Sequence, residues 1–406
     1  MRMLVRLLAT FAIVCGGIAP IFDARADQAD PVRVTSGLSY QLIARWDVDK
    51  LNTILKSDAP KYFGLAVPYT PARNAVRLYR VTYASVIPER GNKPTVATGL
   101  LAVPEVSATE FPLLSYQHGT VFGREQVPSF PDQSPETQLV LAQFAGQGYI
   151  VIGADYFGLG QSQEPEGFMV KGSHQQATHD MLSAARVVLE QMKLSTTRTF
   201  LGGWSQGGFV TMALLERLES AGVPVAGAAT ASGAFDGYAF FSGFLDFPRK
   251  TDAGWVTTLF ILSSFSFESY YGVPGLARSL INDDGYEVSR KLYDRRLQDP
   301  GQIPTDLRKL VRPDYFDPSF FATSAFGRLL NQKTNAYRWI VKTPVRNYFG
   351  EADEVITPGL GALAMTYQRA MGGGNMRVDA ISTGQTNHRG TYATAVPLWK
   401  RWFDER

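Results

Sequence analysis

The chain has 406 residues, of which 45% are hydrophobic and 19% charged, and its formal net charge is +3. This composition indicates a globular protein with a large apolar core and excludes a disordered or fibrous chain. Basic and acidic residues are scattered along the sequence, so no basic stripe predicts a nucleic-acid partner.

Residues 1–26 have the pattern of an export signal. Two arginines precede an apolar run over residues 7–22, and Ala24-Arg25-Ala26 offers a cleavage site. Glycines and a proline interrupt the run, which favours a cleaved signal over a membrane anchor. We therefore expect cleavage after Ala26, a secreted or periplasmic protein, and no stable membrane span. Cleavage also removes Cys15, the only cysteine, so we expect no disulfide in the mature protein.

Residues 27–75 are interpreted as an N-terminal extension, in which only residues 48–55 have a helical pattern. From residue 76 the sequence alternates between apolar, often β-branched residues and polar ones. Residues 78–85 and 96–103 are predicted to pair as a β-hairpin, because turn-forming residues around Gly91 separate them.

Short apolar segments then alternate with longer amphipathic ones. Strands are expected at residues 111–116, 149–154, 199–204, 225–231, 345–349 and 376–381, and helices at 136–148, 177–192, 207–218 and 391–403. This alternation predicts βαβ crossovers, and therefore an α/β fold with a mostly parallel central sheet and helices on both faces. The core is expected to comprise residues 76–232 and 341–406.

Residues 233–340 interrupt the alternation and are expected to form a helical lid or cap. Within them, residues 235–271 hold twelve aromatic side chains, about a third of that stretch, against 12% for the whole chain. These side chains could form the core of a small subdomain, or an apolar substrate pocket over the carboxyl ends of the strands. The two roles are compatible, and Phe240 and Phe241 are the predicted substrate-binding residues of the insertion.

Gly203-Trp204-Ser205-Gln206-Gly207 is the G-x-S-x-G motif of the chain. A predicted strand runs directly into it and a helix follows, which is the context of a nucleophile elbow. The sharp turn strains the backbone at the serine, and the two glycines let strand and helix approach each other closely. Ser205 is therefore the predicted nucleophile and Trp204 a predicted substrate-binding residue. The alternative is an ordinary serine in a glycine-rich turn.

A serine hydroxyl needs a base to take its proton, and the base needs a third group to orient it. In an elbow of this type the chain order is serine, acid, histidine. His388 is the only histidine after Ser205, so it is the predicted base.

The acid is expected in the loop after residues 345–349, where three carboxylates compete. Asp353 is best placed, since it follows a glycine in the turn and two apolar residues then return the chain to the core. Glu351 and Glu354 are the alternatives, and both are expected to be solvated.

A tetrahedral oxyanion needs at least two preorganised donors. The amide of Gln206, at the start of the predicted helix, is expected to be one. The amide of Thr120 is expected to be the second, because Gly119 lets the loop after residues 111–116 approach the substrate. His118 precedes the nucleophile and is expected to be structural.

The remaining polar candidates are assigned no catalytic role. Asp155, after residues 149–154, is expected to accept hydrogen bonds that stabilise its loop. His174 and His179 are five residues apart, which is poor spacing for metal ligands, so we predict neither a metal nor a cofactor.

Several segments at the expected site together match a known family: Gln117-His118-Gly119-Thr120, Asp155-Tyr156-x-Gly158-x-Gly160, Gly203 to Gly208, and the segments around Asp353 and His388. On these motifs the chain resembles the secretory lipase family of α/β-hydrolases over roughly residues 75–405. The resemblance implies a carboxylic-ester substrate and a lid after the fourth strand. The fungal members use disulfides, which the mature chain lacks, so the resemblance is to a bacterial-type relative.

We therefore predict a serine esterase or lipase that cleaves small-molecule or lipid esters through an acyl-enzyme on Ser205, with His388 as base and Asp353 as orienting acid. Acyl chain length and oligomeric state are left open. Alternatives are a carbon–carbon bond hydrolase, a non-catalytic binding module on the same scaffold, and a serine peptidase or amidase. A peptidase specific for free N-termini would need carboxylates in the cap, for which the candidates are Asp236, Asp246 and Glu268.

Overall fold

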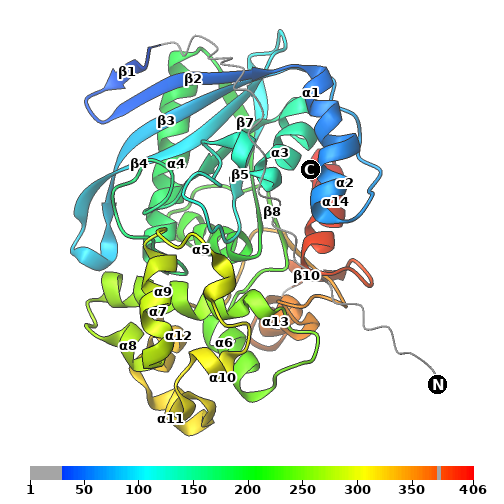
Figure 1. Ribbon diagram of the computed structural model, residues 1–406. Helices are drawn as coiled ribbons and strands as arrows, with labels where there is room; N and C mark the ends of the chain where they lie inside the picture. Colours follow the sequence, from blue (N-terminus) through cyan, green and yellow to red (C-terminus); the bar gives the residue numbers. More distant parts are fainter. Residues whose placement is uncertain (1–29, 373–375) are drawn as a thin grey trace, which may run out of the picture.

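The computed structural model of the protein describes residues 30–372 and 376–406 (Figure 1). The predicted export signal, its cleavage site and Cys15 lie outside the described residues. Among the helices that are described, none is both long and apolar enough to cross a bilayer.

A ten-stranded sheet runs through the described part of the chain, in the order β1-β2-β3-β4-β6-β5-β7-β8-β9-β10. Strands β1 to β4 and the β4–β6 pair are antiparallel, and the strands from β6 onward in this order are parallel. The mostly parallel α/β sheet predicted from the sequence is confirmed. The strands are β1 (Val32–Thr35), β2 (Leu38–Trp46), β3 (Val76–Ile87), β4 (Lys93–Pro104), β5 (Glu110–Gln117), β6 (Ile150–Ala154), β7 (Ser195–Trp204), β8 (Gly227–Ala231), β9 (Val345–Phe349) and β10 (Val378–Ser382).

The predicted hairpin is formed by β3 and β4, with Leu78 opposite Ala102 in the register. The chain turns at Gly91 and Asn92, both of which have positive φ. Strands β1 and β2 lie in the extension for which only a helix is predicted. Most residues of β2 are half-buried, so its sequence lacks the strict alternation that identifies β3.

Helices cover both faces of the sheet. Adjacent side chains of β5 point to opposite faces, so Leu113 belongs to the apolar core under α4 and α5, and Leu114 to the core under α3 and α14. Phe209 lies in the first core and Trp399 in the second, and both are fully buried. The helices of the core are α1 (Val48–Thr53), continued by a π-helical turn (Ile54–Asp58), α2 (Ala59–Phe63), α3 (Pro135–Gln143), α4 (Lys171–Gln191), α5 (Gln206–Ser220), α13 (Pro358–Met371) and α14 (His388–Asp404).

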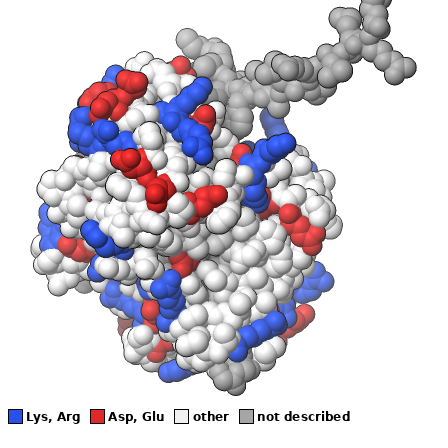
Figure 2. All heavy atoms as spheres, turned by 90° about the horizontal axis from the view of Figure 1, so that it is seen from below, with Lys and Arg blue, Asp and Glu red and all other residues white. Residues whose placement is uncertain are grey.

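The segment between β8 and β9 is helical in the structure, and its helices gather at one end of the molecule (Figure 1). Its aromatic side chains pack together: the ring of Phe241 lies 4.7 Å from that of Phe260 and 5.7 Å from that of Phe326. Positive and negative side chains alternate over the outer face at this end, with no continuous basic patch on that face (Figure 2). The helices are α6 (Gly237–Asp246), α7 (Thr257–Tyr271), α8 (Leu276–Leu280), α9 (Asp283–Tyr293), α10 (Leu307–Leu310), α11 (Pro318–Thr323) and α12 (Ala325–Lys333).

Candidate active site

Strand β7 runs into helix α5 through a single residue, Ser205, which has φ 57° and ψ −119°. A positive φ of this kind costs a non-glycine residue about 1–3 kcal/mol and persists only where the surroundings impose it. The Ser205 amide donates to the carbonyl of Ala231 on the neighbouring strand (2.9 Å). A Cβ on Gly203 would overlap the Gly207 carbonyl, and one on Gly207 would overlap the carbonyl of Gln117. The two glycines thus let strand, helix and the loop after β5 meet at the serine.

The structure brings Ser205, His388 and Asp353 together, although they are far apart in the sequence. His388 Nε2 lies 3.0 Å from Ser205 Oγ, and His388 Nδ1 lies 3.1 Å from each carboxylate oxygen of Asp353. All three residues are buried, and Ser205 keeps 9% of its surface exposed. The contacts have the connectivity and lengths of a nucleophile, its base and an orienting acid.

Asp353 is held in an ionised state. Its Oδ1 accepts from the amides of Val355 and Ile356 (2.8 Å each), and its Oδ2 accepts from the Ser232 hydroxyl (2.7 Å). Burial alone would raise the pKa of Asp353, but the interaction with His388 and these hydrogen bonds outweigh it and lower the pKa below its ordinary value. The carboxylate is therefore fixed toward the Nδ1 atom of the histidine.

The two competing carboxylates have other partners. Glu351 is exposed and accepts from the side chains of Ser382 (2.7 Å) and Gln385 (2.6 Å). Glu354 is half-buried and accepts from the backbone amide of His388 (2.9 Å), so it fixes the start of α14. The expectation of a solvated side chain is therefore wrong for Glu354, because its carboxylate caps this helix.

The two predicted oxyanion donors lie on segments that meet at the elbow. The Gln206 amide is the first of α5, and its side chain turns away to contact Nε2 of buried His174 (3.2 Å). Gly119 lies beside the elbow, since a Cβ on it would come 3.3 Å from the Trp204 carbonyl oxygen. Within residues 30–372 and 376–406, no backbone hydrogen bond engages the amide of Gln206 or of Thr120. Both amides are left for an external acceptor.

His118 has a structural environment. It is fully buried, its ring stacks on Tyr156 (4.0 Å between centroids), and its Nδ1 lies 2.8 Å from the Gly119 carbonyl oxygen. Burial lowers its pKa to about 4, against hydrogen bonds that would raise it, so the ring is neutral at pH 7. Asp155, also buried, accepts from Thr98 and Ser129 (2.6 Å each), as expected of a loop-stabilising acceptor.

The predicted substrate-binding aromatics have different environments. Trp204 stacks on Tyr392 (4.9 Å) and its ring lies 5.2 Å from that of His388, so it packs directly behind the histidine. Phe240 and Phe241 contact each other and further phenylalanines of the insertion, and Phe241 has no exposed surface. These contacts give no support to a role for the two residues in a substrate pocket. The composition of the sequence could not separate the core of a subdomain from the lining of a pocket.

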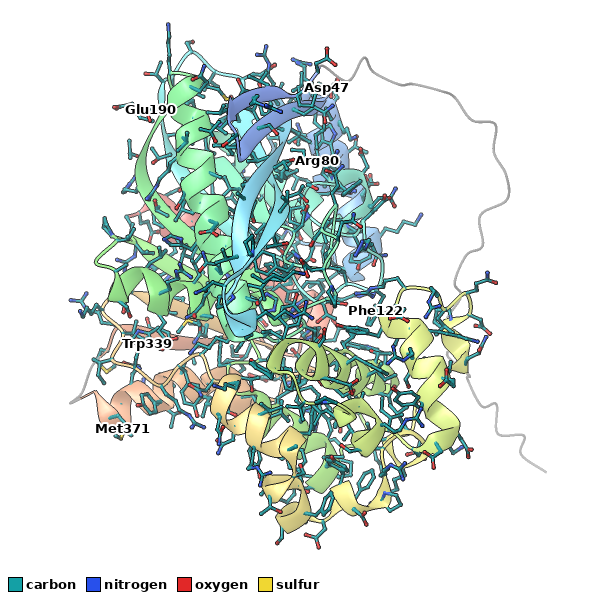
Figure 3. All side chains as sticks on the ribbon, turned by 90° about the vertical axis from the view of Figure 1, so that its left-hand side faces the viewer. Asp47, Arg80, Phe122, Glu190, Trp339 and Met371 are labelled. Atoms are coloured by element: carbon teal, nitrogen blue, oxygen red, sulfur yellow. The ribbon has the colours of Figure 1, made fainter. Side chains whose placement is uncertain are left out.

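The aromatic residue of the insertion that does lie at the site is Trp255. Its ring is 6.3 Å from His388 and 6.3 Å from Phe122, which is exposed and lies where the core meets the insertion (Figure 3). The segment before it contacts the acid loop, since Arg249 donates to the Asp353 carbonyl (3.1 Å). Sequence reasoning missed Trp255, although it belongs to the aromatic stretch that signalled a cap.

Comparisons with known proteins identify the fold that carries this site. The structure superposes on a Legionella pneumophila protein described as a hydrolase, with 20% identity over 92% of this chain and 97% of that one and a TM-score of 0.79. The rice cell wall degrading esterase LipA of Xanthomonas oryzae is 22% identical over 90% of this chain and 95% of that one, with a TM-score of 0.73. Candida antarctica lipase A is 15% identical over 86% of this chain and 77% of that one, with a TM-score of 0.55. The protein has the α/β-hydrolase fold. Residues 135–239 match the prolyl oligopeptidase family, and no curated protein matches the sequence.

Glu136, near the start of α3, is a buried carboxylate that the sequence does not single out. It accepts from the Gly119 amide (3.0 and 3.2 Å to its two oxygens) and from the Tyr116 hydroxyl (2.7 Å). No lysine or arginine in the described part of the chain forms an ion pair with it. Burial therefore dominates and raises its pKa to about 7, although both hydrogen bonds and His388 act to lower it.

We expect Glu136→Gln to stabilise the fold at pH 8 but not at pH 4.5. The folded-state pKa of about 7 lies above the ordinary 4.5. The protonated carboxyl of Glu136 therefore makes its full contribution to stability below pH 4.5, and this contribution is lost as the pH rises through 7. At about 1.4 kcal/mol per pKa unit, the rise from 4.5 to about 7 means that the charged carboxylate costs about 3 kcal/mol at pH 8. Denaturant unfolding at both pH values measures this, and an equal effect of the substitution at the two pH values would contradict it.

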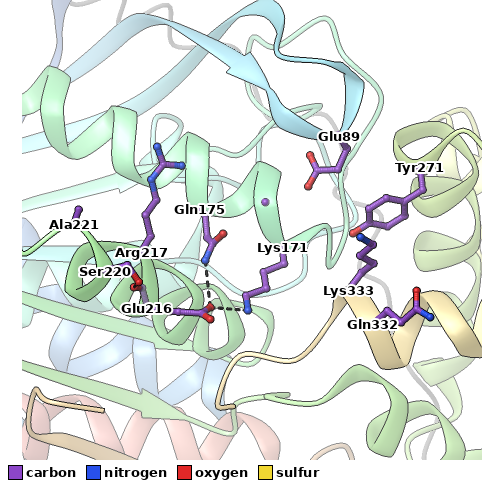
Figure 4. A pocket seen from close by; sticks show the side chains of 11 residues that line it. Glu89, Lys171, Gln175, Glu216, Arg217, Ser220, Ala221, Tyr271, Gln332 and Lys333 are labelled. Carbon is purple, nitrogen blue, oxygen red and sulfur yellow. Dashed lines mark hydrogen bonds and ion pairs between the residues drawn. The ribbon is translucent and has the colours of Figure 1, made fainter. Parts of the chain in front are cut away.

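One surface hollow of the protein, about 750 Å³, lies away from the triad and is lined by charged residues (Figure 4). Lys171 pairs with Glu216 there (2.6 Å), beside Glu89, Arg217 and Lys333. None of the triad residues lines it. Its charged wall does not fit the apolar substrate pocket expected of an ester hydrolase.

Proposed function

We propose that the protein is a serine hydrolase that cleaves carboxylic esters through an acyl-enzyme on Ser205. The observation that carries the proposal is the chain of contacts from Ser205 Oγ to His388 Nε2 and from His388 Nδ1 to Asp353. The strained backbone of Ser205 at the start of α5 adds support, because strain of this size clusters at functional sites. The esterase and lipase among the similar structures favour an ester over other acyl compounds.

In the proposed reaction, His388 removes the hydroxyl proton as Ser205 attacks the ester carbonyl. Ionised Asp353 holds the imidazole in the tautomer with its proton on Nδ1 and stabilises the imidazolium that forms. The amides of Gln206 and Thr120 bind the oxyanion. His388 then gives its proton to the departing alcohol, and a water molecule activated by the same histidine hydrolyses the acyl-enzyme.

The substrate class we propose is a small-molecule or lipid ester. Trp255 and Phe122 present aromatic surface beside the histidine, where the acyl or alcohol part of such a substrate would lie. We also propose that the protein acts outside the cytoplasm, on the strength of the signal pattern in residues 1–26.

A serine peptidase is the second candidate, because residues 135–239 match the prolyl oligopeptidase family. Two of the three cap carboxylates that could hold a free amine already have partners. Asp236 accepts from Arg338 (2.9 Å) and is buried, and Glu268 accepts from the amide of Ala277 (2.9 Å). These contacts favour the ester.

The experiment that tests the proposal is hydrolysis of p-nitrophenyl esters of increasing acyl length, run beside aminoacyl and dipeptidyl p-nitroanilides. We expect ester cleavage by the mature protein, with a chain-length optimum that separates esterase from lipase. Cleavage of anilides without esters would show that the peptidase is the correct function.

Asp353→Asn should lower kcat about 10³- to 10⁴-fold, since an amide stabilises the wrong tautomer of His388 and no imidazolium. The matched control is Glu354→Gln, which alters a neighbouring carboxylate that contacts only the backbone of His388. Its kcat should stay within about tenfold of wild type. Steady-state kinetics on the best ester measures both, and equal losses in the two variants would count against Asp353 as the orienting acid.

A further inference from the structure

The loop that carries the Thr120 amide is held on both sides of Gly119. On one side, the Gly119 amide donates to both carboxylate oxygens of Glu136. On the other side, the Gly119 carbonyl oxygen lies 2.8 Å from His118 Nδ1 and accepts a hydrogen bond from it in the tautomer that carries the proton on Nδ1; Nε2 lies farther, at 3.2 Å, from the Asp155 carbonyl oxygen. The Gly119 carbonyl and the Thr120 amide belong to one trans peptide, so they point in opposite directions. Fixing the carbonyl therefore aims the Thr120 amide away from His118.

Glu136 is itself fixed by groups from distant parts of the chain. The Tyr116 hydroxyl donates to its carboxylate (2.7 Å), and the Tyr392 hydroxyl donates to its backbone carbonyl (2.9 Å). The carboxylate packs beside Gly119, since a Cβ there would lie 3.4 Å from its Oε2 atom. A side chain held at this many points is a rigid support for the loop.

The charge around Glu136 is not balanced by a permanent cation. The titratable side chains that interact with it are those of Tyr62, Tyr116, Tyr156, Tyr392 and His388. Burial raises the pKa of each tyrosine, so all four are neutral, and only His388 can carry an opposing charge. The ionised carboxylate thus costs folding free energy above pH 7, which an amide or apolar side chain would avoid. A residue that reduces stability in the site fits a functional role better than a structural one.

We propose that Glu136 is a positioning residue for the oxyanion hole, which holds the Gly119 amide and thereby aims the Thr120 amide at the developing oxyanion. The proposal rests on the proposed function. An ionised carboxylate is the stronger acceptor for the Gly119 amide, so the support is firmest above pH 7 and weakens below it.

The test compares Glu136→Met, which fills similar volume without an acceptor, with Glu136→Gln, which keeps one acceptor oxygen. Tyr116→Phe is the matched control, since it removes another hydrogen bond to the same carboxylate and leaves the Gly119 bond in place. We expect Glu136→Met to lower kcat about 100-fold with KM within about threefold, as loss of one oxyanion donor does. Glu136→Gln and Tyr116→Phe should each stay within about tenfold of wild type, because each keeps an acceptor for the Gly119 amide.

The pH profile supplies the readout that a merely structural role would not move. The ratio of wild-type to Glu136→Gln kcat should rise about fivefold to tenfold between pH 5.5 and 8.5, because only the wild type ionises at position 136. A constant ratio, or a folded Glu136→Met variant with wild-type kcat, would overturn the proposal. Thermal melting of each variant identifies any loss of fold.

The rate of fluorophosphonate labelling at Ser205 distinguishes this failure from failure of the proposed function. Labelling does not need an ester substrate, but its transition state also places a negatively charged oxygen in the oxyanion hole. Equal labelling rates for wild type and Glu136→Met would reject the positioning role of Glu136 and leave the proposed serine hydrolase standing. Absence of labelling and of ester hydrolysis in the wild type rejects the serine hydrolase, and the positioning role with it.

Discussion

Ser205→Ala should abolish ester hydrolysis, with kcat reduced by at least about 10⁴-fold. Among the described residues, the Ser205 hydroxyl is the one hydrogen-bonding partner of His388 Nε2, at 3.0 Å, so the variant has no nucleophile for the acyl transfer. The residual rate over uncatalysed hydrolysis should come from the oxyanion donors, which the substitution leaves in place. Steady-state kinetics on a p-nitrophenyl ester measures the loss.

The fold should tolerate this change. Alanine at position 205 keeps the strained φ of 57° and loses only the hydroxyl, so the melting temperature should stay within a few degrees of the wild-type value. Full ester hydrolysis by a folded Ser205→Ala variant would show that another residue attacks the substrate.

Gly207→Ala should destabilise the fold by more than about 3 kcal/mol. Overpacking costs about 1–3 kcal/mol where neighbouring side chains can move aside, and the atoms that the new methyl group would meet belong to the backbone. The added Cβ would overlap the carbonyl groups of Gln117 and His118. Both are backbone groups of the loop that leads to Thr120. The melting temperature should fall by about 5 °C or more, and ester hydrolysis should be lost because helix α5 and this loop are pushed apart.

Gly243→Ala is the matched control for this substitution. Gly243 lies inside α6, and a Cβ on it would meet nothing within 4 Å. Alanine is favoured over glycine in a helix interior by about 1 kcal/mol, so this variant should be slightly more stable than wild type. A Gly207→Ala protein as stable and active as Gly243→Ala would refute the close contact at the elbow.

The parallel strand β6 could be predicted because it is a short, fully buried apolar run, whereas β9 includes polar and half-buried residues. Helix α4 begins at Lys171, six residues before the predicted start at Ala177. The prediction missed its first turns because they are polar and lack the apolar spacing of a helix. Helix α13 was not predicted. Its larger apolar residues, Leu360, Leu363 and Met365, are only half-buried, and the chain enters it directly from the acid loop.

Predicting the site from sequence works for residues whose role is tied to local pattern or chain order. Ser205 follows from its motif and His388 from its position after it. Glu136 depends on Tyr116 and Tyr392, which come from other elements, and a buried glutamate has the same local sequence as an exposed one. Its environment becomes visible only when the three elements are packed together.

The most direct test of the serine hydrolase is reaction of the mature protein with a fluorophosphonate, followed by peptide mapping by mass spectrometry. The account predicts a single adduct, on the hydroxyl of Ser205, and none in Ser205→Ala or after acid unfolding of the wild type. An adduct on another serine, or no adduct in a folded protein, would contradict it.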